Sequence, residues 1–128
     1  MEPWGPYTAD QHGIGGSEEA VIYLAPALAH RGFDVQVYGP TPEDLRPVHV
    51  HEGVTWRPLA AFHPQLDVDH IIALRSPEAV LMQTATKAPI WIWHHDHAYP
   101  ADQWGPGVVR RARHLYVSKW QRKVLEAQ

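Results

Sequence analysis

The stretch GIGGSEE at residues 13–19 leads directly into an apolar segment that begins at residue 20. Gly15 and Gly16 lack a Cβ, so the backbone can turn tightly here and approach a ligand closely. Ser17 is a favourable N-cap residue, and the two glutamates after it suit the positive end of a helix dipole. The stretch therefore predicts a loop that leads into the N-terminus of a helix.

The residues after the glycines predict an amphipathic helix over residues 17–31. Apolar side chains recur there at spacings of three and four, which gives the helix one core-facing side. These side chains are Val21, Leu24, Ala25, Leu28 and Ala29. The sequence Arg31-Gly32 predicts the end of the helix. Pro26 lies inside the helix and has no amide hydrogen to donate, so we expect a kink or a local opening there.

Unpaired backbone amides at the start of this helix would point toward whatever lies above the glycines. Such a site suits an anion, most often a phosphate or a diphosphate. The alternative is that the glycines only form a tight connection, because short glycine motifs often occur without a ligand.

The composition is typical of a soluble globular protein: of 128 residues, 45% are hydrophobic and 20% are charged. The sequence has no apolar run long enough to span a membrane, and residues 1–6 lack the features of a signal peptide. Cysteine is absent, which excludes disulfides and cysteine-based zinc sites. We therefore expect a cytoplasmic protein.

Charge is distributed unevenly along the chain. The net charge is −3 with histidine neutral, yet residues 104–128 carry six Lys or Arg against one Glu. A basic C-terminal segment suits an anionic lipid surface, a nucleic acid or an acidic partner, and it is also typical of an ordinary solvated helix face. Among partners we expect a peripheral membrane contact and no nucleic acid.

Short apolar strands alternate with helices along the rest of the chain. We expect an irregular loop over residues 1–16 and one α/β core over residues 17–128. The strands are predicted at residues 33–39, 48–51, 54–58, 70–75, 90–97 and 114–117, and further helices at 76–86 and 118–127. The fourth strand is apolar nearly throughout, which is typical of a parallel strand buried on both faces. The pattern predicts a single Rossmann-like domain whose mostly parallel sheet carries helices on both faces.

Ligands of such sheets bind outside the carboxyl ends of the strands. By this rule the glycine loop, Arg75, the tip at residues 94–97 and Ser118 should meet at one edge. The Arg75 guanidinium can hold a phosphate or a carboxylate there. Trp4 lies in a predicted loop, where we expect surface packing or stacking on a sugar or base.

The tip His94-His95-Asp96-His97 carries the most chemistry. A histidine beside Asp96 can place its imidazole next to a reacting hydroxyl, with the carboxylate fixing the tautomer. The pair His95 and His97 can also ligate zinc, although the sequence nominates no third ligand. A third alternative is a polar strand end whose histidines make local hydrogen bonds.

Taken together, these stretches resemble the N-terminal domain of the family 4 retaining glycosyltransferases, which are enzymes of the GT-B fold. The matching segments recur in family order at residues 2–21, 28–39, 75–77, 95–96 and 117–121.

The resemblance implies transfer of a sugar from a nucleotide-sugar donor to a sugar or lipid-linked acceptor, with no metal or other cofactor required. It implies that the glycine pair approaches the donor diphosphate and that the histidine of the His-Asp motif lies near the transferred sugar. We assign catalysis to His95 and Asp96, with His94 or His97 as substitutes for His95, and donor binding to Gly15, Gly16, Ser17, Arg75 and Ser118. No metal ligand is assigned.

The resemblance covers only the first of the family's two domains, and the second domain is the one that mostly binds the nucleotide sugar. We therefore expect the donor site to need a second lobe, most simply a second copy of the chain, because twofold dimers are the commonest assembly. One alternative is a non-catalytic module that binds a sugar, a nucleotide or a partner. A lesser one is a histidine-rich metal-binding protein.

Overall fold

The computed structural model describes residues 3–11, 16–42, 48–63, 67–74, 88–95 and 112–127. The chain divides into two compact units, a first unit (Met1–Phe62) and a second unit (His63–Gln128). Each contains a three-stranded sheet that is wholly or partly parallel, so the α/β class is confirmed. The described strands thus form two small sheets where the sequence predicted one. A single Rossmann-like domain stays a prediction.

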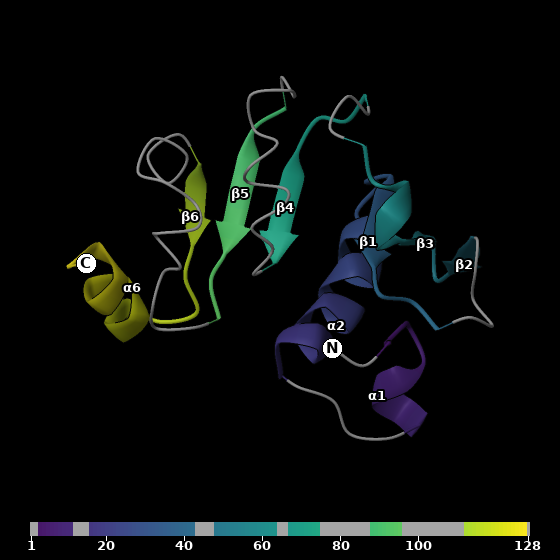
Figure 1. The fold of residues 1–128 in the computed structure, drawn as a ribbon, viewed down its shortest axis with the longest axis horizontal. Coiled ribbons are helices and arrows are strands. Elements are labelled where there is room, and N and C mark those ends of the chain that lie inside the picture. Colours follow the sequence, from purple (N-terminus) through teal and green to yellow (C-terminus); the bar gives the residue numbers. More distant parts are fainter. Residues whose placement is uncertain are drawn as a thin grey trace. The chain divides into compact units, whose positions relative to one another are not determined.

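The first unit contains the glycine-opened helix and the sheet that it covers (Figure 1). Its elements in chain order are α1 (Thr8–Gln11), α2 (Gly16–His30), β1 (Val35–Gly39), β2 (His49–His51), β3 (Val54–Pro58) and the 3₁₀ turn η2 (Leu59–Ala61). The strand order is β1-β3-β2, in which β3 runs parallel to β1 and antiparallel to β2. The predicted helix and these three strands are therefore confirmed within two residues at each end.

The turn from β2 to β3 consists of two residues with positive φ, Glu52 at 50° and Gly53 at 78°. Positive φ at both central positions is the geometry of a type I′ turn, whose twist matches that of the flanking strands. Gly53 adopts this conformation without steric cost, whereas Glu52 does so against the preference of an L-residue.

Two tryptophans form the centre of the first unit's core. Trp56 is 1% exposed, and the Trp4 ring packs edge-on against it with centroids 5.8 Å apart. The Trp4 amide donates to the Pro40 carbonyl at 2.9 Å, which fixes the N-terminal segment beside the end of β1. Surface packing of Trp4 was therefore the wrong expectation, because residues 1–16 show no periodicity from which its burial could be predicted and a long-range contact buries it.

The α2 helix runs from Gly16 to His30 without a break at Pro26. Its buried residues are Ile22 and Ala25, whereas Leu24, which was expected on the core-facing side, is exposed. The buried face of α2 is thus centred on Ile22 and Ala25, which belong to one core cluster with Val54 and Trp56 of β3.

The direction of α2 follows from one contact near its end. A Cβ added at Gly53, which directly precedes β3, would lie 3.3 Å from the Cβ of Ala29. The C-terminal end of α2 therefore lies at the start of β3, and its N-terminal end lies toward the carboxyl ends of β1 and β3 (Figure 1). Gly16 is placed at the edge where ligands of parallel sheets bind.

The second unit contains a wholly parallel sheet and one described helix. Its elements are β4 (Ile71–Leu74), β5 (Ile90–Trp93), β6 (Arg113–Leu115) and α6 (Lys119–Glu126), with strand order β4-β5-β6. The expectation that the fourth strand is buried on both faces was wrong, because Ile72 is 45% exposed while its neighbour Ala73 is buried. The predicted helix at 76–86 lies outside the described residues.

Candidate functional site

The predicted site residues fall into three groups. Gly16 and Ser17 belong to the first unit, and His95 and Ser118 belong to the second. Gly15, Arg75, Asp96 and His97 lie outside the described residues. The meeting of all these groups at one edge stays a prediction.

Gly16 begins α2, and the local structure itself gives no reason for a glycine there. Among the described residues, a Cβ added at Gly16 would meet nothing within 4 Å, and the φ of Gly16 is outside the left-handed region that favours glycine. Gly53 is the opposite case, with a positive φ and a close contact to Ala29. The space in front of Gly16 is therefore open to a ligand that approaches the backbone.

The first turn of α2 also carries Glu18 and Glu19. Both carboxylates interact favourably with the positive end of the helix dipole, but they repel an anion placed there. A diphosphate at Gly16 would therefore need a cation in addition to the helix amides, and Arg75 is the cation that the sequence nominates.

His94 is buried and pairs with a histidine of the neighbouring strand. Its Nε2 lies 2.8 Å from Nδ1 of His114, and its backbone amide donates to the Leu115 carbonyl at 2.9 Å. The ring of Tyr116 stacks on the His94 ring with centroids 5.3 Å apart. His94 thus joins the ends of β5 and β6, which is a structural role.

His95 follows β5 and lies on the other face of the sheet, because successive residues of an extended chain alternate. Its ring packs against Trp93, two residues earlier, with centroids 4.7 Å apart. Of the two described histidines at this tip, His94 is engaged with His114, and the catalytic role assigned to His95 stays a prediction.

Ser118 lies three residues beyond β6, and His95 lies two residues beyond β5. These strands are parallel neighbours, so both residues follow the same edge of the sheet. The Ser118 hydroxyl accepts a hydrogen bond from the Gln121 amide at 3.0 Å and caps α6. The predicted cap is confirmed, and a donor-binding role for Ser118 stays a prediction.

A second cluster of aromatic and histidine side chains, in the first unit, was not predicted from the sequence. The Tyr7 hydroxyl lies 2.7 Å from Nε2 of His49, and the Tyr7 ring packs on His51 with centroids 4.6 Å apart. His49 and His51 share one face of β2, which is the same His-x-His spacing that drew attention at residues 95–97. The spacing was the available signal, but nothing in the sequence pointed to Tyr7.

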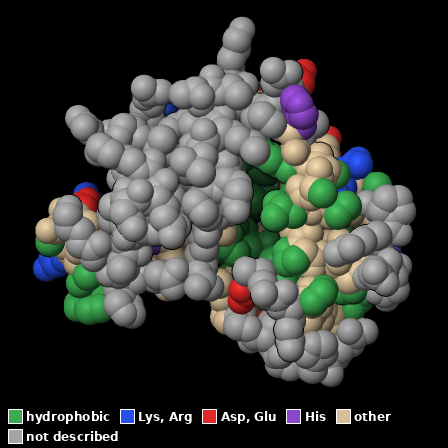
Figure 2. Space-filling view, in the orientation of Figure 1, with side chains coloured by type: hydrophobic (Ala, Val, Ile, Leu, Met, Phe, Trp, Pro, Cys, Tyr) green, Lys and Arg blue, Asp and Glu red, His purple; other side chains and the backbone are tan. Residues whose placement is uncertain are grey.

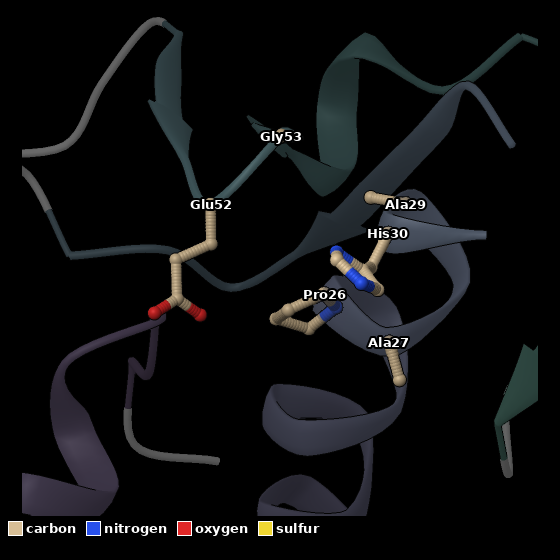
Figure 3. Close-up of a pocket in the computed structure, with 6 residues that line it drawn as sticks. All are labelled: Pro26, Ala27, Ala29, His30, Glu52 and Gly53. Carbon is tan, nitrogen blue, oxygen red and sulfur yellow. The ribbon is translucent and has the colours of Figure 1, made fainter. Parts of the chain in front are cut away.

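An open hollow of about 580 Å³ lies at the C-terminal half of α2 (Figure 3). Its lining residues are Pro26, Ala27, Ala29, His30, Glu52 and Gly53. Pro26 and His30 border one side and Glu52 the other (Figure 3). This hollow lies at the opposite end of the helix from Gly16, so it is separate from the predicted diphosphate site.

Within the described ranges, no group of three or more His, Asp or Glu side chains is arranged to hold a metal ion. No described helix is long and apolar enough to cross a membrane.

Comparison with the models of protein families, with curated proteins and with solved structures gave no match to this chain.

Proposed function

We propose that this chain is a glycosyltransferase-like protein that transfers a sugar from a nucleotide-sugar donor to an acceptor. The observation that carries the proposal is the open space in front of Gly16, at the carboxyl edge of the parallel strands β1 and β3. Backbone amides at a helix N-terminus favour a phosphate group. A diphosphate can approach the backbone closely at a glycine, because glycine has no Cβ. The fold itself does not require glycine at this position, so ligand binding accounts for it.

His95 supplies the second part of the proposed site. A reaction that expels a nucleoside diphosphate depends more on stabilising the charge of the leaving group than on a strong base. In this proposal the amides at Gly16 and Ser17, with Arg75 and Ser118, hold the diphosphate. His95 and Asp96 lie beside the transferred sugar and orient its hydroxyl groups.

The proposal includes a finer fold, in which both sheets belong to one Rossmann-like domain of the GT-B type. It also includes a second lobe that completes the donor site, most simply another copy of the chain. Closed twofold dimers are the commonest assembly and give each copy the same interface.

The test is nucleoside diphosphate release by the purified chain across a panel of nucleotide sugars. We expect Gly16→Ala to reduce release by at least about tenfold, because misplacement of a bound group by about 1 Å costs on this order or more. The folded structure has room for this Cβ, so the unfolding midpoint should not fall. His95→Ala should reduce release as well.

The matched control is His70→Ala. His70 directly precedes β4, at the amino end of the same sheet that carries His95 at its carboxyl end, and it accepts a hydrogen bond from Trp91 Nε1. Its removal should leave release unchanged. Absence of release from every donor would contradict the proposal, and donor binding measured by calorimetry would then identify a non-catalytic module.

A further inference from the structure

The α6 helix presents apolar and cationic side chains on the same exposed surface. Trp120 is 63% exposed and Val117 is 56% exposed. Lys119, Arg122 and Lys123 are exposed beside them. Hydrophobic and cationic side chains lie next to one another over α6 in the space-filling view (Figure 2).

The helix holds this surface in a fixed geometry. Ser118 caps α6 by accepting from the Gln121 amide, and the Gln121 side chain in turn accepts from the Val117 amide at 2.7 Å. Gln121 and Leu125 are buried and anchor the opposite side of the helix. The backbone around Val117 and Trp120 is therefore fixed by the helix cap and by the buried side of α6.

The cations of α6 differ in their surroundings. Arg122 donates to Glu126 at 2.9 Å, and this hydrogen bond with the attraction between the charges raises the pKa of Arg122. Lys119 and Lys123 form no ion pair in the part of the chain that the structure describes. The positive charge of these two lysines is therefore not neutralised by an ion pair with any carboxylate among the described residues.

We propose that this surface, made of Val117, Lys119, Trp120 and Lys123, docks the protein on an anionic lipid membrane. Tryptophan is favoured at the membrane interface, where its ring meets both apolar chains and polar headgroups. Lysines at the rim of an apolar surface attract anionic headgroups. A nucleic acid would use the lysines but would give Val117 nothing to bury against, so the lipid surface is the better match. The inference goes beyond the proposed sugar transfer and does not depend on it.

The test is cosedimentation of the full chain with vesicles of phosphatidylcholine, with and without phosphatidylglycerol. We expect binding only to the anionic vesicles, weakening as salt is added because salt screens the attraction. The double variant Lys119→Gln/Lys123→Gln should lower vesicle affinity about 20- to 30-fold, on the basis of about fivefold for each cation near the surface.

Trp120→Ala should weaken binding severalfold and remove much of the fluorescence quenching by brominated lipids. The matched control is Tyr23→Ala on α2, since Tyr23 is 60% exposed but belongs to the first unit, and it should leave binding unchanged. Circular dichroism should show that each variant remains folded.

Either of two results would overturn the proposal. One is the absence of binding to anionic vesicles at low salt. The other is binding that survives both the lysine and the Trp120 substitutions. Tighter binding to a DNA duplex than to the vesicles would assign the surface to nucleic acid instead.

Discussion

The two units differ in the interactions that stabilise their strands. In the first unit, aromatic and aliphatic side chains from α2, β3 and the N-terminal segment pack together around Trp56. In the second unit, polar rings gather where β5 and β6 end, at His94, His114 and Tyr116. Burial of apolar side chains therefore stabilises most of the first unit. In the second unit, stacking and hydrogen bonding between polar rings stabilise the described strand ends.

The largest expected effect tests the core of the first unit. Trp56→Ala should lower the free energy of unfolding by about 3–5 kcal/mol, because it removes a fully buried side chain and leaves a cavity. Urea unfolding measures the loss, and hydrogen exchange should show it mainly in β1 and β3. Trp120→Ala removes the same kind of ring from an exposed position and should change stability little. Equal losses for both variants would contradict this view of the core.

A smaller effect tests the ring pair of the second unit. His114→Ala removes the 2.8 Å hydrogen bond to the buried His94 and should cost about 1–3 kcal/mol of unfolding free energy. The matched control is again His70→Ala, whose hydrogen bond with Trp91 is exposed and should cost less. If the two substitutions cost the same, the pair does not stabilise the strand ends as we describe.

The smallest effect compares the two glycines of the first unit. Gly53→Ala should destabilise the chain by about 1–2 kcal/mol, because its φ of 78° disfavours an L-residue and the new Cβ would crowd Ala29. Gly16→Ala should cost nothing in thermal unfolding, since its Cβ would meet open space. A stability loss at Gly16 as large as that at Gly53 would mean that the fold itself requires the first glycine.

Local sequence signals predicted much of the described structure. The glycines, Ser17 and the apolar periodicity predicted α2 to within one residue at each end. Ser118 predicted the start of α6 and its cap. These features depend on neighbours in the chain, so a short window of sequence contains the information that decides them.

Other features depended on contacts between distant residues, and for these the sequence was a poor guide. The short helix α1 was predicted as loop, because it has only four residues and follows a segment rich in proline and glycine. The burial of Trp4 results from contacts with Pro40 and Trp56. The exposure of Trp120 depends on which side of α6 the buried Leu125 anchors.

The sequence by itself determined the α/β alternation, the glycine at the start of α2 and the concentration of histidine after β5. Only the tertiary structure distinguished Gly16 from Gly53 and His94 from His95. The physical reason is that a glycine or a histidine has the same local propensities in either role. What differs is the space around a missing Cβ and the partner that a ring nitrogen meets across the sheet.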